Sequence, residues 1–170
     1  MPREYQGGKT QTFQKLYGYK KLIAWQKADD LAAMVYEVTR GFGAGHYRLL
    51  DQMRGSASSV KDNIAEGYCR AALGDYIRFC EIARGSLGEL GSQIQSCERW
   101  RLVAGTKFAD LLEQYGDTTY LLERLITSLI EKRQAGDWDR SFGVKEERAV
   151  YLADDADYPF ELPEEVAERN

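Results

Sequence analysis

Cationic side chains are the residues of this sequence most suited to a chemical task. The candidates are Lys20, Lys21, Lys27, Arg54, Lys61, Arg70, Arg78 and Arg84. Lysine and arginine hold phosphate groups through charge and hydrogen bonds, so these side chains are candidate contacts to the backbone of RNA or DNA. Solvated surface charge is the alternative interpretation for each of them.

Catalytic and metal-binding patterns find little support. The single histidine, His46, stands in a glycine-rich stretch and lacks the Glu-x-x-His partner that a metal site in a helical bundle uses. Ser56, Ser58 and Ser59 have no nearby base to activate a nucleophile, so we interpret them as small packing residues. The sequence therefore predicts a protein without catalytic activity, metal or cofactor.

Charge divides the chain into a body and a tail. The 170 residues carry a net charge of -4. Asp137 to Asn170 hold 11 acidic and 4 basic residues, a net of -7, which leaves a net of +3 on the residues before them. A mildly basic body followed by an acidic tail therefore describes the chain better than its net charge does.

Cysteine usage and hydropathy indicate the compartment. Cys69, Cys80 and Cys97 are odd in number and form no C-x-x-C pair, so we predict reduced, buried thiols. No apolar stretch approaches the roughly 20 residues that a membrane-spanning helix needs. We therefore expect a cytoplasmic protein without a membrane partner.

Four segments show helical periodicity. The first runs from about Leu22 to Arg40 and ends in a glycine-rich stretch, and the second runs from about Tyr47 to Tyr68. After a turn, Asp75 is expected to cap the third helix, which ends near Arg101. The seam of this helix steps by four and three residues through Tyr76, Cys80, Ala83, Leu87, Leu90, Ile94 and Cys97. Gly105 and Thr106 are expected to provide the break and the cap before the fourth helix.

Amphipathic helices with short connections predict an all-α protein, an antiparallel up-down-up-down four-helix bundle. We place the bundle at residues 21–133. A polar, flexible leader precedes it at residues 1–20, and an acidic extension follows it at residues 134–170. This extension cannot build a core of its own, so it is disordered, lies over the bundle or docks on a partner.

Small residues gather on a second face of the third helix. Gly85, Gly88, Ser92 and Ser96 fall together, away from the apolar seam. Because each glycine inside a helix costs about 1 kcal/mol relative to alanine, something must offset that cost. Two interpretations stay open: a tight crossing inside the bundle, or contact with a second copy of the chain. Apolar residues beyond the seam, such as Phe79 and Ile82, favour a homo-oligomer.

Motifs in the order in which they occur resemble those of one family. They are Lys21-Leu22-Ile23-Ala24-Trp25-Gln26-Lys27-Ala28, Gln52-Met53-Arg54, Asn63-Ile64-Ala65-Glu66-Gly67 and Ile82-Ala83-Arg84-Gly85-Ser86-Leu87-Gly88-Glu89-Leu90. They are similar to the bacterial four-helix-bundle proteins of ribosomal RNA intervening sequences, which include the accessory variability determinant of diversity-generating retroelements. The resemblance covers residues 19–133. It implies a ring-like homopentamer and, in the retroelement branch, binding to nucleic acid and to a reverse transcriptase.

Three features depart from the family pattern. Gly55 replaces a basic residue, Lys61 replaces a proline, and the acidic tail is an addition. The first and third reduce positive charge and so weaken the inference of nucleic-acid binding. We therefore hypothesise a non-enzymatic oligomeric accessory protein that binds RNA or DNA and a reverse transcriptase. The alternative is a protein-binding scaffold whose tail recruits a partner without nucleic acid.

Overall fold

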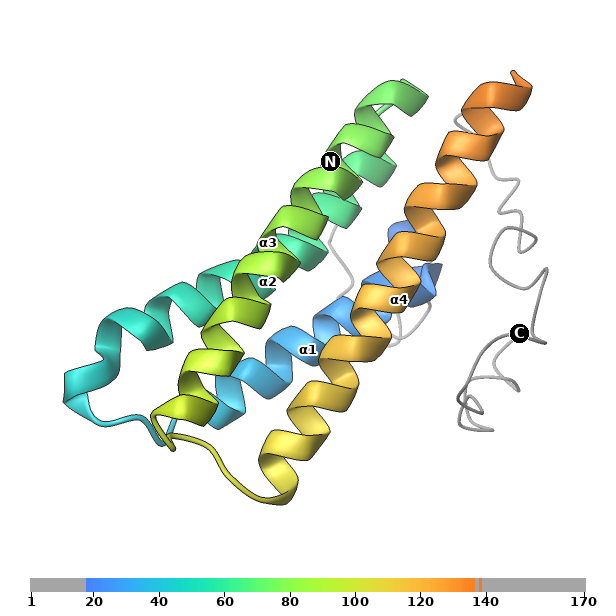
Figure 1. Ribbon diagram of the computed structural model, residues 1–170. Helices are drawn as coiled ribbons and strands as arrows, with labels where there is room; N and C mark the ends of the chain where they lie inside the picture. Colours follow the sequence, from blue (N-terminus) through green and yellow to red (C-terminus); the bar gives the residue numbers. More distant parts are fainter. Residues whose placement is uncertain (1–17, 137, 139–170) are drawn as a thin grey trace, which may run out of the picture. The chain divides into compact units, whose positions relative to one another are not determined.

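Four long α-helices make up the computed structural model, which describes residues 18–136 and 138 (Figure 1). In chain order, the helical elements are η2 (Gly18–Lys21), α1 (Ile23–Thr39), η3 (Ala44–His46), α2 (Tyr47–Cys69), α3 (Leu73–Arg99) and α4 (Thr106–Ala135), where η marks a 3-10 helix. The expectations for residues 1–17 of the leader and for most of the acidic extension lie outside the described residues, whereas residues 18–20 of the predicted leader belong to η2. Among the described residues, no helix is both long and apolar enough to cross a bilayer.

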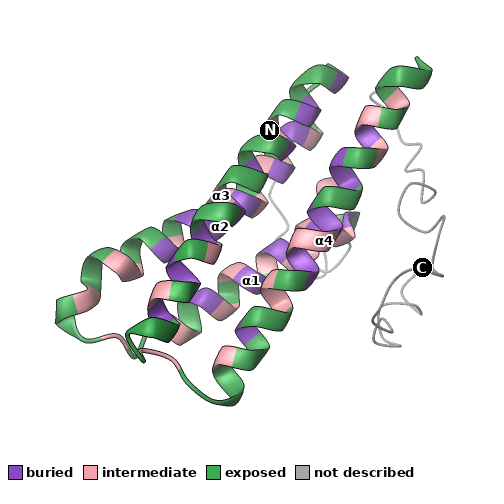
Figure 2. Cartoon of the chain, in the orientation of Figure 1, coloured by how far each residue is buried: buried purple, intermediate pink, exposed green. Residues whose placement is uncertain are grey.

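Each helix packs against its neighbours in sequence, and α4 returns to pack against α1. The predicted all-α, up-down bundle is thus confirmed. Its core is almost wholly aliphatic, because the three-four spacing turns one stripe of every helix inward, as Figure 2 shows. Fully buried side chains from all four helices meet there: Leu31, Val35, Met53, Val60, Ile64, Leu90, Ile94, Leu111, Leu122 and Leu125.

Two helix starts differ from expectation. Asp75 does not cap α3, because the helix begins at Leu73 and Ala72 takes the N-cap position without a side-chain hydrogen bond. Asp75 instead lies in the first turn, where its charge still favours the positive end of the helix dipole. Thr106 does not cap α4 either, because it is the first residue of that helix. Gly105 takes the N-cap position at a φ of 67°, a backbone region that glycine adopts readily.

Two glycines permit close helix contacts inside the bundle. A Cβ added at Gly67 would lie 2.8 Å from Tyr76 Cδ2, 2.9 Å from Phe79 Cβ and 3.1 Å from the Tyr76 carbonyl oxygen. A Cβ added at Gly91 would lie 2.8 Å from Tyr115 Cζ and still closer to the Tyr115 hydroxyl. Helix α3 can therefore approach α2 closely at Gly67, whereas Gly91 leaves room on α3 for the end of the Tyr115 side chain from α4.

Two of the three cysteines occupy the core. Cys80 and Cys97 are fully buried, and the Cys97 thiol donates to the Met53 sulfur at 3.4 Å. Burial, with the nearby Glu81 carboxylate, raises the pKa of the Cys80 thiol from 9.0 to about 12, and burial raises that of Cys97 to about 11. Both therefore stay protonated at neutral pH. The prediction of a buried thiol is wrong for Cys69, which is exposed at the end of α2.

Candidate oligomer and nucleic-acid interfaces

The predicted small-residue face of α3 is open within one protomer. Gly85, Gly88 and Ser92 are exposed, and Ser96 is half-buried. A Cβ added at Gly85 or Gly88 would meet no atom within 4 Å. The interpretation of these glycines as a tight crossing inside the bundle is therefore wrong. Gly67 serves that purpose instead, where α2 packs against α3.

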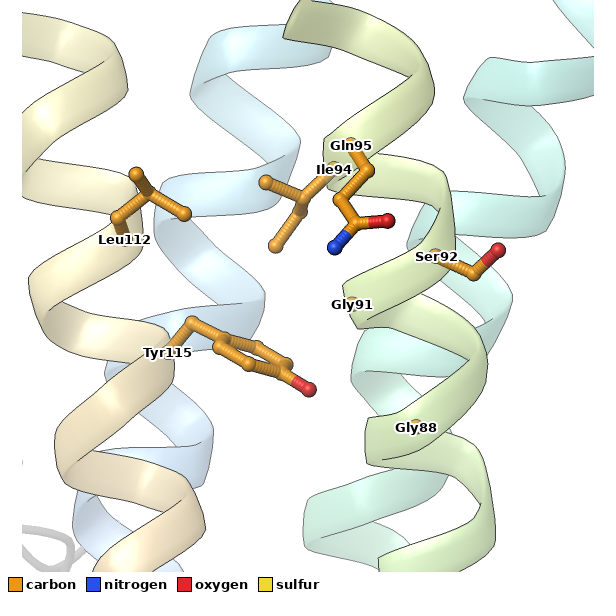
Figure 3. A pocket seen from close by; sticks show the side chains of 7 residues that line it. All are labelled: Gly88, Gly91, Ser92, Ile94, Gln95, Leu112 and Tyr115. Atoms are coloured by element: carbon orange, nitrogen blue, oxygen red, sulfur yellow. The ribbon is translucent and has the colours of Figure 1, made fainter.

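A shallow groove lies beside this face, between α3 and α4 (Figure 3). Its volume is about 360 Å³, and its lining residues are Gly88, Gly91, Ser92, Ile94, Gln95, Leu112 and Tyr115. Leu112 is 44% exposed, and Tyr115 projects from α4 toward Gly91 (Figure 3). Farther along α4, the Ile126 side chain is buried inside the bundle. Leu112 and, on α3, Ile82 (42% exposed) are the apolar side chains left uncovered near the glycines.

Lys27, a predicted phosphate contact, is engaged between helices. Its ammonium group lies 2.8 Å from Asp117 Oδ2, and the Asp117 side chain is almost completely buried. The backbone carbonyl of Lys27 also accepts hydrogen bonds from Gln114 Nε2 at 2.8 Å and Thr118 Oγ1 at 3.2 Å. Lys27 therefore joins α1 to the middle of α4. Periodicity could not indicate this role, because the partners of Lys27 lie some 90 positions later in the chain.

Arg54 also makes contacts inside the protomer. Its Nε donates to Thr39 Oγ1 at 2.9 Å, and an Nη donates to the Tyr36 carbonyl oxygen at 3.4 Å. The guanidinium lies 4.0 Å from the centre of the Tyr36 ring. Arg54 therefore joins α2 to the last turn of α1.

Three more of the predicted contacts form ion pairs. Lys61 Nζ lies 3.1 Å from Asp29 Oδ1, so this pair links α2 to α1. Arg84 lies 3.7 Å from Glu123 on α4. Arg70 pairs with Glu66 one turn earlier and covers the Phe79 ring. These are half-exposed pairs, and each stabilises the fold by less than about 1 kcal/mol.

The last three candidates are Lys20, Lys21 and Arg78. Helix η2 carries both lysines and packs against α2, where the rings of Tyr19 and Tyr68 lie 6.5 Å apart. The two lysines and Arg70 therefore lie at the same end of the bundle, whereas Arg54, Lys61 and Arg84 lie along its length. Arg78 is exposed on α3 and forms no ion pair among the described residues.

Other chemistry has no assembled site among residues 18–136 and 138. No group of three or more metal-ligating side chains comes together in that part of the chain. The His46 ring stacks on the Trp100 ring, with centroids 6.3 Å apart. Ser59 shares a 2.8 Å hydrogen bond with Ser86 across the α2–α3 contact, in keeping with its predicted packing role.

Comparison with known protein families extends these observations. The family of 23S rRNA-intervening sequence proteins matches residues 20–124, which is more than half of the chain and includes most of the bundle. A search of curated proteins gave no match. The matched region contains all four motifs, the close-contact glycines and the open face of α3. The chain belongs to the 23S rRNA-intervening sequence protein family.

Proposed function

We propose that this protein is a non-enzymatic accessory factor that works as a homo-oligomer and binds nucleic acid. The observation that carries the proposal is the open face of α3. Gly85 and Gly88 weaken an exposed helix, by about 1 kcal/mol each, without serving any contact in the protomer. The helix of a second copy packed against them would offset that cost, because glycine lets backbones approach closely.

Apolar side chains beside the glycines support self-association. Ile82 and Leu112 flank the open face, and the groove next to Leu112 could receive a side chain from a neighbouring copy. The resemblance to accessory variability determinants implies five copies in a ring. A ring repeats every cation on each subunit, so weak phosphate contacts add up to avid binding.

Nucleic acid is the partner class that the family resemblance and the exposed cations support. Lys20, Lys21 and Arg78 are the predicted phosphate contacts that we retain, with Arg70 beside the two lysines. The finer proposal is that the protein also partners a reverse transcriptase in a diversity-generating retroelement. A neighbouring reverse-transcriptase gene with paired template and variable repeats would support it, and a locus without them would contradict it.

Filter binding of RNA across a salt series tests the binding. The account predicts an affinity that falls steeply as salt rises, because each phosphate contact releases a counterion. A Lys20→Glu, Lys21→Glu, Arg78→Glu variant should bind more weakly at every salt concentration. Arg124→Glu, at an exposed position on α4, is the matched control and should change binding less. Undetectable binding at low salt would contradict the proposal.

A protein-binding scaffold is the second candidate. One observation favours it: Lys27, Arg54, Lys61, Arg70 and Arg84 already hold partners within the protomer. A scaffold would keep the oligomer but lose the salt-dependent binding of RNA. The same filter-binding series therefore separates the two functions.

A further inference from the structure

One end of the bundle combines exposed aromatic rings with five cations, four of which form no ion pair among the described residues. We define the connection end as residues 40–48, which join α1 to α2, together with residues 99–107, which join α3 to α4. We propose that the connection end binds single-stranded nucleic acid, with unpaired bases stacked on Trp100 and Tyr47 and phosphates held by the surrounding cations. This inference rests on the proposed function, but it names a different surface and specifies the strandedness of the ligand.

The two connections lie side by side. The His46 and Trp100 rings, one from each connection, are 6.3 Å apart with an interplanar angle of 29°. Figure 1 shows the same arrangement, with the loop before α2 passing the end of α3. Residues 54 positions apart in sequence therefore lie side by side at this end.

Aromatic side chains at the connection end are open to solvent. Tyr47 is 73% exposed and Trp100 is 58% exposed, among the highest values for large hydrophobic residues in the described chain. Figure 2 shows that exposed residues predominate where α2 and α4 begin and where α3 ends. The His46 ring lies beside the Trp100 ring, and more than half of Trp100 remains exposed. An exposed, supported ring is what base stacking requires, and it tolerates any base.

Charge at the connection end is of one sign. The two segments hold five cations and no carboxylate: Arg40, Arg48, Arg99, Arg101 and Lys107. Arg40 pairs with Glu37 at 3.1 Å. The other four form no ion pair among the described residues, although Asp51, Glu98 and Asp110 occupy the flanking helical turns. A polyanion is therefore the ligand whose charge complements this surface.

Arg101 stands where the fold itself favours another residue. Its φ is 55°, in the left-handed region. The amide of Arg101 bonds to the Glu98 carbonyl and that of Leu102 to the Cys97 carbonyl, which is the Schellman ending of a helix. Glycine is usual at this position, and in this chain Gly136 adopts the left-handed conformation where α4 ends. An arginine costs stability there, so its side chain is retained for another reason.

Arg48 and Lys107 also occupy positions where a positive charge lowers the stability of the helix. Each lies in the first turn of its helix, α2 or α4, where the helix dipole disfavours a positive charge. Neither first turn holds an acidic residue that would relieve the repulsion. Three of the five cations are thus unfavourable to local structure, and a bound phosphate backbone would compensate all three.

Single strands fit this surface better than duplexes. Bases in a duplex are stacked on one another and cannot offer their faces to Trp100 or Tyr47. The connection end also presents rings and cations on short loops, without a helix or ribbon shaped to enter a groove. Stacking with backbone contacts is the mode of proteins that bind unpaired strands with little sequence preference.

Fluorescence anisotropy of the full-length protein tests the proposal with three labelled probes: a short oligothymidine, an abasic strand of equal length and a duplex of equal length. We expect oligothymidine to bind most tightly. Trp100→Ala should weaken that binding by about 10-fold and leave the abasic strand unaffected, because only the stacking is removed. Trp100→Phe should restore most of the loss. Thr127→Ala, which truncates an exposed side chain in the second half of α4, is the matched control.

Arg101→Gly supplies a second, independent readout. It should weaken binding of both single strands while the midpoint of thermal unfolding stays equal or rises, which a structural role for Arg101 would not allow. Equal affinity for oligothymidine and the abasic strand, or unchanged binding by Trp100→Ala, would overturn the inference and leave the proposed function standing. Displacement of oligothymidine by an equal charge of polyglutamate would overturn it in favour of an acidic protein partner. Absence of binding to every strand at low salt would contradict the proposed function itself.

Discussion

At the scale of single residues, glycines with different surroundings have different tasks. Gly67 lies against α3 and leaves no space for a Cβ, whereas Gly55, Gly85 and Gly88 face open space. The spacing of Val60, Ile64 and Gly67 by four and three residues places Gly67 on the apolar face of α2. It did not reveal Gly91, because the partner side chain, Tyr115, lies on the next helix.

Gly67→Ala should destabilise the fold by about 1–3 kcal/mol, since the added methyl group meets the Tyr76 carbonyl and Phe79 Cβ. Gly55→Ala is the matched control, because it lies in the same helix with no atom within 4 Å of a Cβ. We expect it to stabilise the protein by about 1 kcal/mol. Urea unfolding followed by circular dichroism measures both. Equal effects of the two substitutions would contradict the close α2–α3 contact.

Cys80 should make stability fall at alkaline pH. Its folded pKa of about 12 lies above the value of 9.0 for a free thiol, so the unfolded state releases a proton that the folded state keeps. Unfolding is therefore favoured as pH rises above 9, by about 1.4 kcal/mol at pH 10. Cys80→Ala should remove that part of the decline between pH 8 and pH 10. Cys69→Ala, at the exposed cysteine, should leave the pH dependence unchanged, and an equal change in both variants would exclude this mechanism.

At the scale of elements, the helices follow from apolar periodicity and their contacts do not. Three-four spacing predicted all four helices to within a few residues, because it reflects which face of each helix avoids water. Arg54 and Lys61 were predicted as solvent-facing cations, yet both bind residues of α1. Periodicity locates a residue on its helix, but the partner across the interface depends on how two helices are aligned.

The Lys27–Asp117 pair should stabilise the α1–α4 contact more than any exposed pair does. Asp117→Ala leaves a half-buried ammonium without its carboxylate, and we expect a loss of about 1–3 kcal/mol. Asp29→Ala removes the more exposed Lys61 pair and should cost less than about 1 kcal/mol. Urea unfolding of the single variants and of the Lys27→Met, Asp117→Ala double variant measures the coupling. A double variant that loses the full sum of the two single effects would show that the pair contributes nothing.

At the scale of the whole molecule, the bundle leaves two surfaces that its own core does not explain. One is the glycine face of α3 with Ile82 and Leu112 beside it, and the other is the aromatic, cationic connection end. The first was visible in the sequence as a second helical face. The second was not, because Tyr47 and Trp100 come from separate segments that only folding brings together. The predicted phosphate contacts likewise lie on separate parts of the bundle, so positive residues that occur close together in a sequence need not form one surface patch.

Sedimentation velocity over a range of protein concentrations shows whether copies of the chain associate through the glycine face of α3. We expect an oligomer for the parent protein. A Gly85→Leu, Gly88→Leu variant should sediment as a monomer with unchanged helicity, since both side chains have open space in the protomer. Gly55→Leu, on another exposed helical face, should leave the oligomer intact. A parent protein that stays monomeric at high concentration, or a double variant that assembles as the parent does, would contradict the account.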